Sequence, residues 1–145
     1  MNARIQIDQL QPQAYKAMYT LEAYLANCDL SKSHKELIKI RASQINGCAF
    51  CINMHTQDAL KMGETEQRIF LLNAWEESGL FNEKERTILS MTEEITLIHK
   101  NGLSEQTYNA AISLFGESYT AQIIMAISII NSWNRIAIST HKPIS

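Results

Sequence analysis

The sequence predicts an all-α protein, a compact helical bundle, on three observations. Apolar residues recur at helical spacing along most of the 145 residues. Helix breakers are rare, because proline stands only at positions 12 and 143 and glycine occurs five times. Strand patterns are almost absent. The length suits one domain, and we expect a single domain over residues 1–145.

Composition argues against several classes of function. The net charge is -2 and basic residues are scattered, so no basic face indicates nucleic-acid binding. The N-terminal "MNARIQIDQL" lacks the apolar region of a secretory signal. The most apolar stretch, "AQIIMAISIINSW", is too short and too polar at its edges to span a bilayer. We therefore expect a cytoplasmic protein with no nucleic-acid or membrane partner.

Three helices are predicted in the first half. The first covers residues 12–27, where apolar side chains repeat every three or four positions. The second is expected to open with a capping box at Ser33–Glu36 and to end at Asn46-Gly47, which can reverse the chain. The third begins near Cys48 and ends at Gly63, a natural residue after a helix end.

Four more segments follow in the second half. Thr65 is expected to cap a short helix that reaches Trp75, and Asn82-x-x-Glu85 to begin a longer helix that ends before Gly102. Ser104-x-x-Thr107 opens a helix that stops at Gly116, and residues 118–139 form the last helix. Its apolar residues cover nearly every face, which is typical of a helix buried all round. Two interpretations stay open, a central helix of the bundle or a subunit interface.

Two cysteines and a histidine form the most informative motif, in "NGCAFCINMHTQ". On a helix, Cys48 and Cys51 project about 60° apart and His55 about 20° from Cys48, so the three share one face. In a cytoplasmic chain with three cysteines, a CxxC pair indicates metal binding or redox chemistry more than a disulfide framework.

Glu36 joins this motif if the chain reverses at Gly47. It lies 11 residues before the turn and His55 lies eight after it, so the two reach similar heights in a helical hairpin. Glu36 can then orient His55, and His55 can accept a proton from Cys51 one turn earlier. The helix dipole favours a thiolate at Cys48, but a positioned base contributes more, so we expect Cys51 to attack and Cys48 to resolve.

The segment "ELIKIRASQINGCAFCINMH" resembles the core of AhpD-like alkylhydroperoxidases in the carboxymuconolactone decarboxylase superfamily. That family's motif is Glu, eleven residues, Cys, two residues, Cys, three residues, His. Here Glu36, Cys48, Cys51 and His55 match every spacing. The strong match covers about residues 30–75, and "NSWNR" at 131–135 is similar to the family's C-terminal region.

The resemblance implies an all-α AhpD-like fold, a homo-oligomer and a peroxidase without a cofactor. It implies that Cys51 is peroxidatic and Cys48 resolving, that hydrogen peroxide or an organic hydroperoxide is the substrate in antioxidant defence, and that a dithiol or thioredoxin-like partner is the reductant. Phe50 departs from the pattern, because the best-studied branch has a histidine between the cysteines. The decarboxylase branch generally lacks the CxxC pair, which disfavours decarboxylation.

Two alternatives remain from the residues themselves. Glu36, Cys48, Cys51 and His55 are four plausible zinc ligands, although structural zinc sites usually place CxxC in a tight knuckle. The chain could also be a non-enzymatic helical interaction module. Other polar residues are given no role in the site: Cys28 is expected to be partly buried, His34, His99 and His141 to lie at the surface or at helix ends, and Arg135 to form a structural ion pair.

Overall fold

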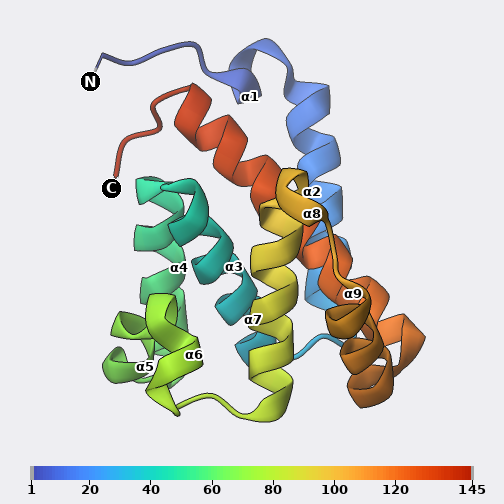
Figure 1. Cartoon of the computed structure of the whole chain (residues 1–145). Coiled ribbons are helices and arrows are strands. Elements are labelled where there is room, and N and C mark those ends of the chain that lie inside the picture. Colours follow the sequence, from blue (N-terminus) through green and yellow to red (C-terminus); the bar gives the residue numbers. More distant parts are fainter. Residues whose placement is uncertain (1, 145) are drawn as a thin grey trace.

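The computed structural model describes residues 2–144, and helices account for all of their regular secondary structure (Figure 1). This confirms the predicted all-α class. The elements are α1 (Ile7–Leu10), α2 (Pro12–Asn27), α3 (Lys32–Asn46), α4 (Ala49–Lys61), α5 (Glu66–Phe70), the 3₁₀ helix η1 (Leu72–Ala74), α6 (Trp75–Ser78), α7 (Glu83–Thr96), α8 (Ile98–Asn101) and α9 (Glu105–Ser139).

Helices α3, α7 and α9 pack against one another at the centre of the molecule, and α4 lies beside α3 (Figure 1). Ile38 from α3, Ile88 from α7 and Ile127 from α9 are fully buried in one apolar cluster. A second cluster joins α3 to the α5–α6 region through Ile40, Leu72 and other side chains. The bundle is therefore built around α3, which faces both clusters.

The apolar pattern of α9 belongs to a central helix. Ile123, Ile127 and Ile130 are buried inside the bundle, whereas Met125 is 39% exposed. Gly116 has φ 78 and ψ 173, which interrupts the helix where the sequence predicts a stop. By length and composition α9 could also cross a membrane, a criterion that the core helix of a globular protein meets as well.

Two of the predicted N-terminal helix caps are present in the structure, and one lies at a different residue. The Asn82–Glu85 capping box and the Ser104 cap are both present. The capping box at Ser33–Glu36 was wrong: Ser31 caps α3 by accepting a hydrogen bond from the His34 amide. Ser31 has extended backbone angles, as an N-cap requires, while Ser33 already lies inside the helix.

Two predicted helices are divided in the structure. Thr65 caps α5 as expected, but the chain then passes through η1 and α6 instead of one helix to Trp75. Helix α7 ends at Thr96 because Leu97 adopts ψ 44, and α8 follows before Gly102. Burial explains the first break, because Ile69, Leu72 and Trp75 all turn into the second apolar cluster.

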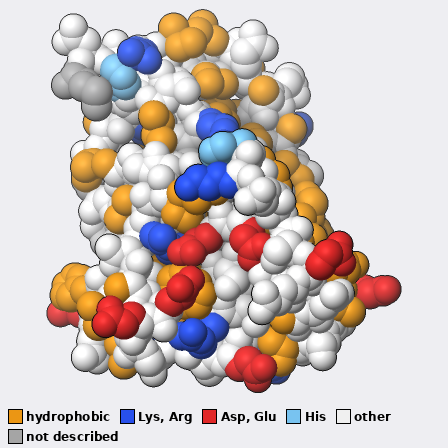
Figure 2. Space-filling model, in the orientation of Figure 1, with side chains coloured by type: hydrophobic (Ala, Val, Ile, Leu, Met, Phe, Trp, Pro, Cys, Tyr) orange, Lys and Arg blue, Asp and Glu red, His pale blue; other side chains and the backbone are white. Residues whose placement is uncertain are grey.

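Charged side chains are mixed over the visible surface. On the face shown in Figure 2, the acidic side chains lie over the lower half with lysine and arginine side chains among them, and the basic side chains form no continuous patch. This face agrees with the scattered charge of the sequence.

Candidate functional site

The turn between α3 and α4 sets the geometry of the site. Gly47 has φ 69, a left-handed conformation that glycine adopts without a Cβ penalty, and it ends α3. The Cys48 amide donates to the Ser43 carbonyl oxygen at 3.0 Å, which closes the reversal. The two helices form the hairpin that the sequence predicts.

Across this hairpin, Glu36 meets His55. The His55 Nδ1 lies 3.6 Å from Glu36 Oε2, and both side chains are largely buried. This separation suits an ion pair but exceeds a hydrogen bond. Neither atom has a hydrogen-bond partner among the described residues. Buried polar atoms normally have a hydrogen-bond partner, so each of these two atoms is the natural partner of the other.

Cys48 and Cys51 stand at the start of α4. Cys48 is the N-cap residue, and its Sγ accepts a hydrogen bond from the Cys51 amide at 3.4 Å. The two residues are joined as a disulfide, with Cα atoms 5.3 Å apart. Their side chains are 1% and 2% exposed, so the pair is enclosed by protein.

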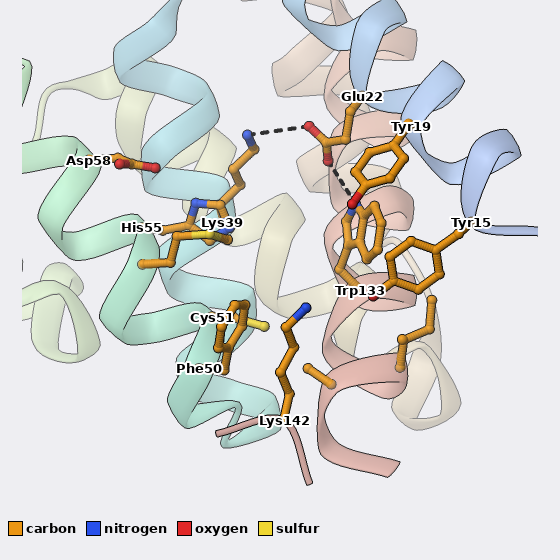
Figure 3. A pocket seen from close by; sticks show the side chains of 13 residues that line it. Tyr15, Tyr19, Glu22, Lys39, Phe50, Cys51, His55, Asp58, Trp133 and Lys142 are labelled. Atoms are coloured by element: carbon orange, nitrogen blue, oxygen red, sulfur yellow. Dashed lines mark hydrogen bonds and ion pairs between the residues drawn. The ribbon is translucent and has the colours of Figure 1, made fainter. Parts of the chain in front are cut away.

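A pocket of about 410 Å³ opens beside the disulfide (Figure 3). Cys51 and His55 line it, whereas Cys48 and Glu36 are not part of its wall. The four predicted residues therefore divide into two that face the cavity and two that lie behind them. A small molecule in the pocket would meet Cys51 before Cys48.

Aromatic side chains form one wall of the pocket. Tyr15 and Tyr19 from α2 pack edge-on or tilted against Trp133 of α9, with ring centroids 5.3 and 5.8 Å from the tryptophan (Figure 3). Burial and the nearby Asp8 carboxylate raise the pKa of Tyr15 above its usual value, which keeps the phenol neutral. The wall offers an apolar surface to an organic molecule.

Charged groups occupy two ends of the same pocket. Glu22 accepts a hydrogen bond from Trp133 Nε1 at 2.9 Å and pairs with Lys39 Nζ at 3.7 Å (Figure 3). Asp58 lies near that pair. Lys142 lies at the other end, with Nζ 4.8 Å from the centre of the Phe50 ring.

A buried amide network fixes the hairpin to α9. Asn46 Nδ2 donates to the Oδ1 atoms of Asn131 and Asn134, each at 2.9 Å, and Asn134 Nδ2 donates to Ser43 Oγ at 3.0 Å. Asn134 is fully buried. The network holds the residues that directly precede Gly47 and Cys48, so "NSWNR" supports the site from behind.

Two minor predictions need correction. Among residues 2–144 Arg135 forms no ion pair: its Nη1 donates to the carbonyl and Oδ1 oxygens of Asn131. His34 is half-buried, and its Nδ1 lies 2.7 Å from the Tyr119 hydroxyl. Cys28 is partly buried, as predicted. Residues 2–144 contain no group of three or more His, Cys, Asp and Glu side chains placed to hold a metal ion, so the geometry gives the zinc alternative no support.

Sequence reasoning missed the pocket wall. The sequence places Tyr15 only within the helix of residues 12–27 and Trp133 only within the last helix, and it gives neither a role in the site. Tyr19, Glu22, Lys39 and Lys142 received no role. No local pattern connects α2 and the C-terminal turn to the CxxC helix, because their approach depends on how α9 crosses the bundle. The "NSWNR" resemblance was the one signal that pointed to this region.

Comparisons with known proteins identify the family of the chain and proteins that share its fold. The model of the carboxymuconolactone decarboxylase family matches residues 12–94. The uncharacterized protein YdfG of Bacillus subtilis (strain 168) is 42% identical over 139 residues, which are 96% of this chain and 95% of that protein. A structure from Agrobacterium tumefaciens, described as a protein of unknown function with a provisional assignment as the antioxidant defence protein AhpD, superposes with a TM-score of 0.95 at 35% identity over 99% of both chains. The apo debrominase Bmp8 shares the fold, with a TM-score of 0.82 at 18% identity over 94% of this chain and 74% of that one.

Proposed function

Because this chain belongs to the carboxymuconolactone decarboxylase family, we propose that it is an AhpD-like enzyme that reduces peroxides with its two paired cysteines. One observation carries the proposal: the Cys48–Cys51 pair lies beside a pocket, and Cys51 forms part of the pocket wall together with His55. The provisional antioxidant assignment of the 35% identical Agrobacterium protein supports the same role.

In the proposed reaction, the Cys51 thiolate attacks the terminal oxygen of a hydroperoxide. The O–O bond breaks, an S–O bond forms, and the alkoxide leaves with a proton from the His55 imidazolium. Cys51 is then a sulfenic acid, which the Cys48 thiol attacks to form the disulfide and release water. Each cycle thus converts one hydroperoxide and two thiols into an alcohol, water and a disulfide.

His55 has two tasks in this scheme, to take the proton of the Cys51 thiol and to return it to the leaving oxygen. The two residues are one helical turn apart on α4 and both face the pocket. The Glu36 carboxylate lies 3.6 Å from Nδ1 on the far side of the ring, where it is placed to orient the imidazole. No cofactor takes part in the scheme.

A reductant must reopen the disulfide. Both sulfurs are nearly fully buried, so a small dithiol, or a thioredoxin-like partner that inserts a thiol into the pocket, suits the cycle better than a bulky surface reductant. The dithiol donates two electrons and two protons and becomes a disulfide itself.

Variants of the three cysteines test the proposal. Reduced wild-type protein should consume an organic hydroperoxide in the presence of dithiothreitol, and Cys51→Ser should abolish this consumption. Cys48→Ser should permit one attack and leave a sulfenic acid at Cys51, detected by dimedone labelling and mass spectrometry. Cys28→Ser is the matched control and should retain activity. Sulfenic acid formation in Cys51→Ser but not in Cys48→Ser would reverse the assigned roles.

A further inference from the structure

Lys142 is a cation at the pocket that the peroxidase scheme does not use. Its Nζ lies 4.8 Å from the centre of the Phe50 ring, and Phe50 directly precedes Cys51. Lys142 and Cys51 line the same cavity (Figure 3). Among residues 2–144 the ion pairs do not include Lys142. Within the described residues, the Lys142 charge at the end of the pocket that holds the reactive sulfur therefore has no ion-pair partner.

A tight turn at the end of α9 places Lys142 beside the pocket. His141 adopts φ 52, a left-handed conformation that is uncommon for residues other than glycine. The His141 amide donates to the Ile138 carbonyl at 3.2 Å and the Lys142 amide donates to the Ala137 carbonyl at 3.0 Å. These two bonds form a Schellman motif, in which glycine is usual at the position of His141. The turn brings the chain back beside the pocket, where the side chain of Lys142 lines the wall.

The other charges of the pocket are compensated or distant. Lys39 pairs with Glu22, whose second oxygen accepts from Trp133. Asp58 stands seven residues after Cys51 on α4, a helical rise of about 10 Å. An anion beside Lys142 would therefore lie away from Asp58, while the apolar wall of Tyr15, Tyr19 and Trp133 remains free for an organic body.

We propose that Lys142 binds the carboxylate of the substrate, and that the enzyme prefers organic hydroperoxides that carry a carboxylate on an apolar body. A hydroperoxide of this class has three parts, and the pocket offers a partner for each. Lys142 can bind the carboxylate, the aromatic wall can contact the apolar body, and Cys51 can attack the peroxide oxygen. Only the peroxide part of this inference rests on the proposed function. Recognition of the carboxylate is a binding property and is measured separately.

Equilibrium binding of two unreactive probes tests the anion site. 4-Isopropylbenzoate and 4-isopropylbenzamide share one body and differ in charge, and isothermal titration calorimetry gives their affinities. Lys142→Met should weaken benzoate binding about tenfold, as expected for a lost charge-assisted contact at a partly solvated site, and should affect benzamide far less. Lys142→Arg should preserve benzoate binding. Lys100→Met removes an exposed lysine of α8 and should behave as wild type.

Kinetics test the preference for reactive substrates. In wild type, kcat/KM for cumene hydroperoxide with a para carboxylate should exceed that for the parent compound, and Lys142→Met should lower this ratio about tenfold. An unchanged benzoate affinity in Lys142→Met, or an equal loss for both probes or both peroxides, would overturn the inference and indicate that Lys142 acts on Cys51 or on the fold. If wild type bound neither probe, the inference would also fail. Benzoate selectivity without consumption of either peroxide would support the anion site and reject the proposed peroxidase.

Discussion

At the scale of single residues, the site depends on a buried acid and a buried base whose facing atoms have no hydrogen-bond partner among residues 2–144. Glu36 and His55 come from different helices, and the closest atoms are 3.6 Å apart. Catalytic hydrogen bonds are often long in the absence of substrate, so this separation fits a contact that tightens when a proton moves to the imidazole. Cys51, one turn away, is the group that this proton comes from in our scheme.

Glu36→Gln tests the electrostatic part of this arrangement. The variant keeps the shape of the side chain but removes the negative charge that faces His55 while the ring carries the proton of Cys51. Peroxide attack at neutral pH should slow by on the order of tenfold or more, and the rate should recover at high pH, where Cys51 ionises unaided. The measurement is a pH–rate profile of single-turnover peroxide consumption.

Glu77→Gln, which changes an exposed acid on α6, is the control for the charge change. A Glu36→Gln profile that overlays the wild-type profile at every pH would show that the carboxylate does not assist His55.

At the scale of elements, the α5–α6 region is held to α7 by one buried acid. Glu85 is 6% exposed, caps α7 together with Asn82, and forms a two-pronged ion pair with Arg68 of α5. Burial alone would raise the pKa of Glu85, but the Arg68 hydrogen bonds and charge and the Asn82 amide outweigh it and lower the pKa below 4.5. Folding therefore favours the ionised form of the Glu85 carboxyl group.

The pH dependence of stability follows from this sign. A carboxyl whose pKa is lowered by folding adds stability above its unfolded value, and this contribution is lost as pH falls through the folded value. Glu85→Gln should reduce the free energy of unfolding by roughly 2 kcal/mol near neutral pH. The difference from wild type should shrink well below pH 4.5 in urea unfolding experiments. A difference that stays constant down to the acid transition would contradict the ionic contribution.

Helix ends show which structural features the sequence could predict and which it could not. Gly47 and the Asn82–Glu85 box depend on a few neighbouring residues, and both were predicted. Ser33 was predicted as the cap because Glu36 follows it three residues later, whereas the extended backbone angles of the structure show that Ser31 is the cap. The pocket wall was missed because Tyr19 and Lys142 approach Cys51 through tertiary packing alone.

At the scale of the whole molecule, α9 buries many of its apolar side chains inside the bundle of its own chain. Of the two interpretations of this helix, Ile127 fits the central helix of a bundle, because it is fully buried between helices of its own chain. The homo-oligomer remains a prediction, to be checked by sedimentation at micromolar concentration.

Ile127→Asp and Ser128→Asp separate folding from association on this helix. The first places a carboxylate in the core and should destabilise the protein by more than about 4 kcal/mol, so that helical circular dichroism is lost on mild heating. The second changes the neighbouring exposed residue and should leave the thermal transition nearly unchanged. Ile127→Asp with wild-type stability and an altered sedimentation coefficient would restore the interface interpretation.

Titration of the fully reduced protein with cumene hydroperoxide tests the central claim most directly. After each addition, free thiols are alkylated and located by peptide mass spectrometry. The account predicts that one equivalent of peroxide consumes two of the three thiols, with Cys48 and Cys51 recovered as a disulfide and Cys28 alkylated. Unreacted peroxide with all three thiols free, or oxidation of Cys28 ahead of the pair, would contradict a Cys48–Cys51 peroxidase.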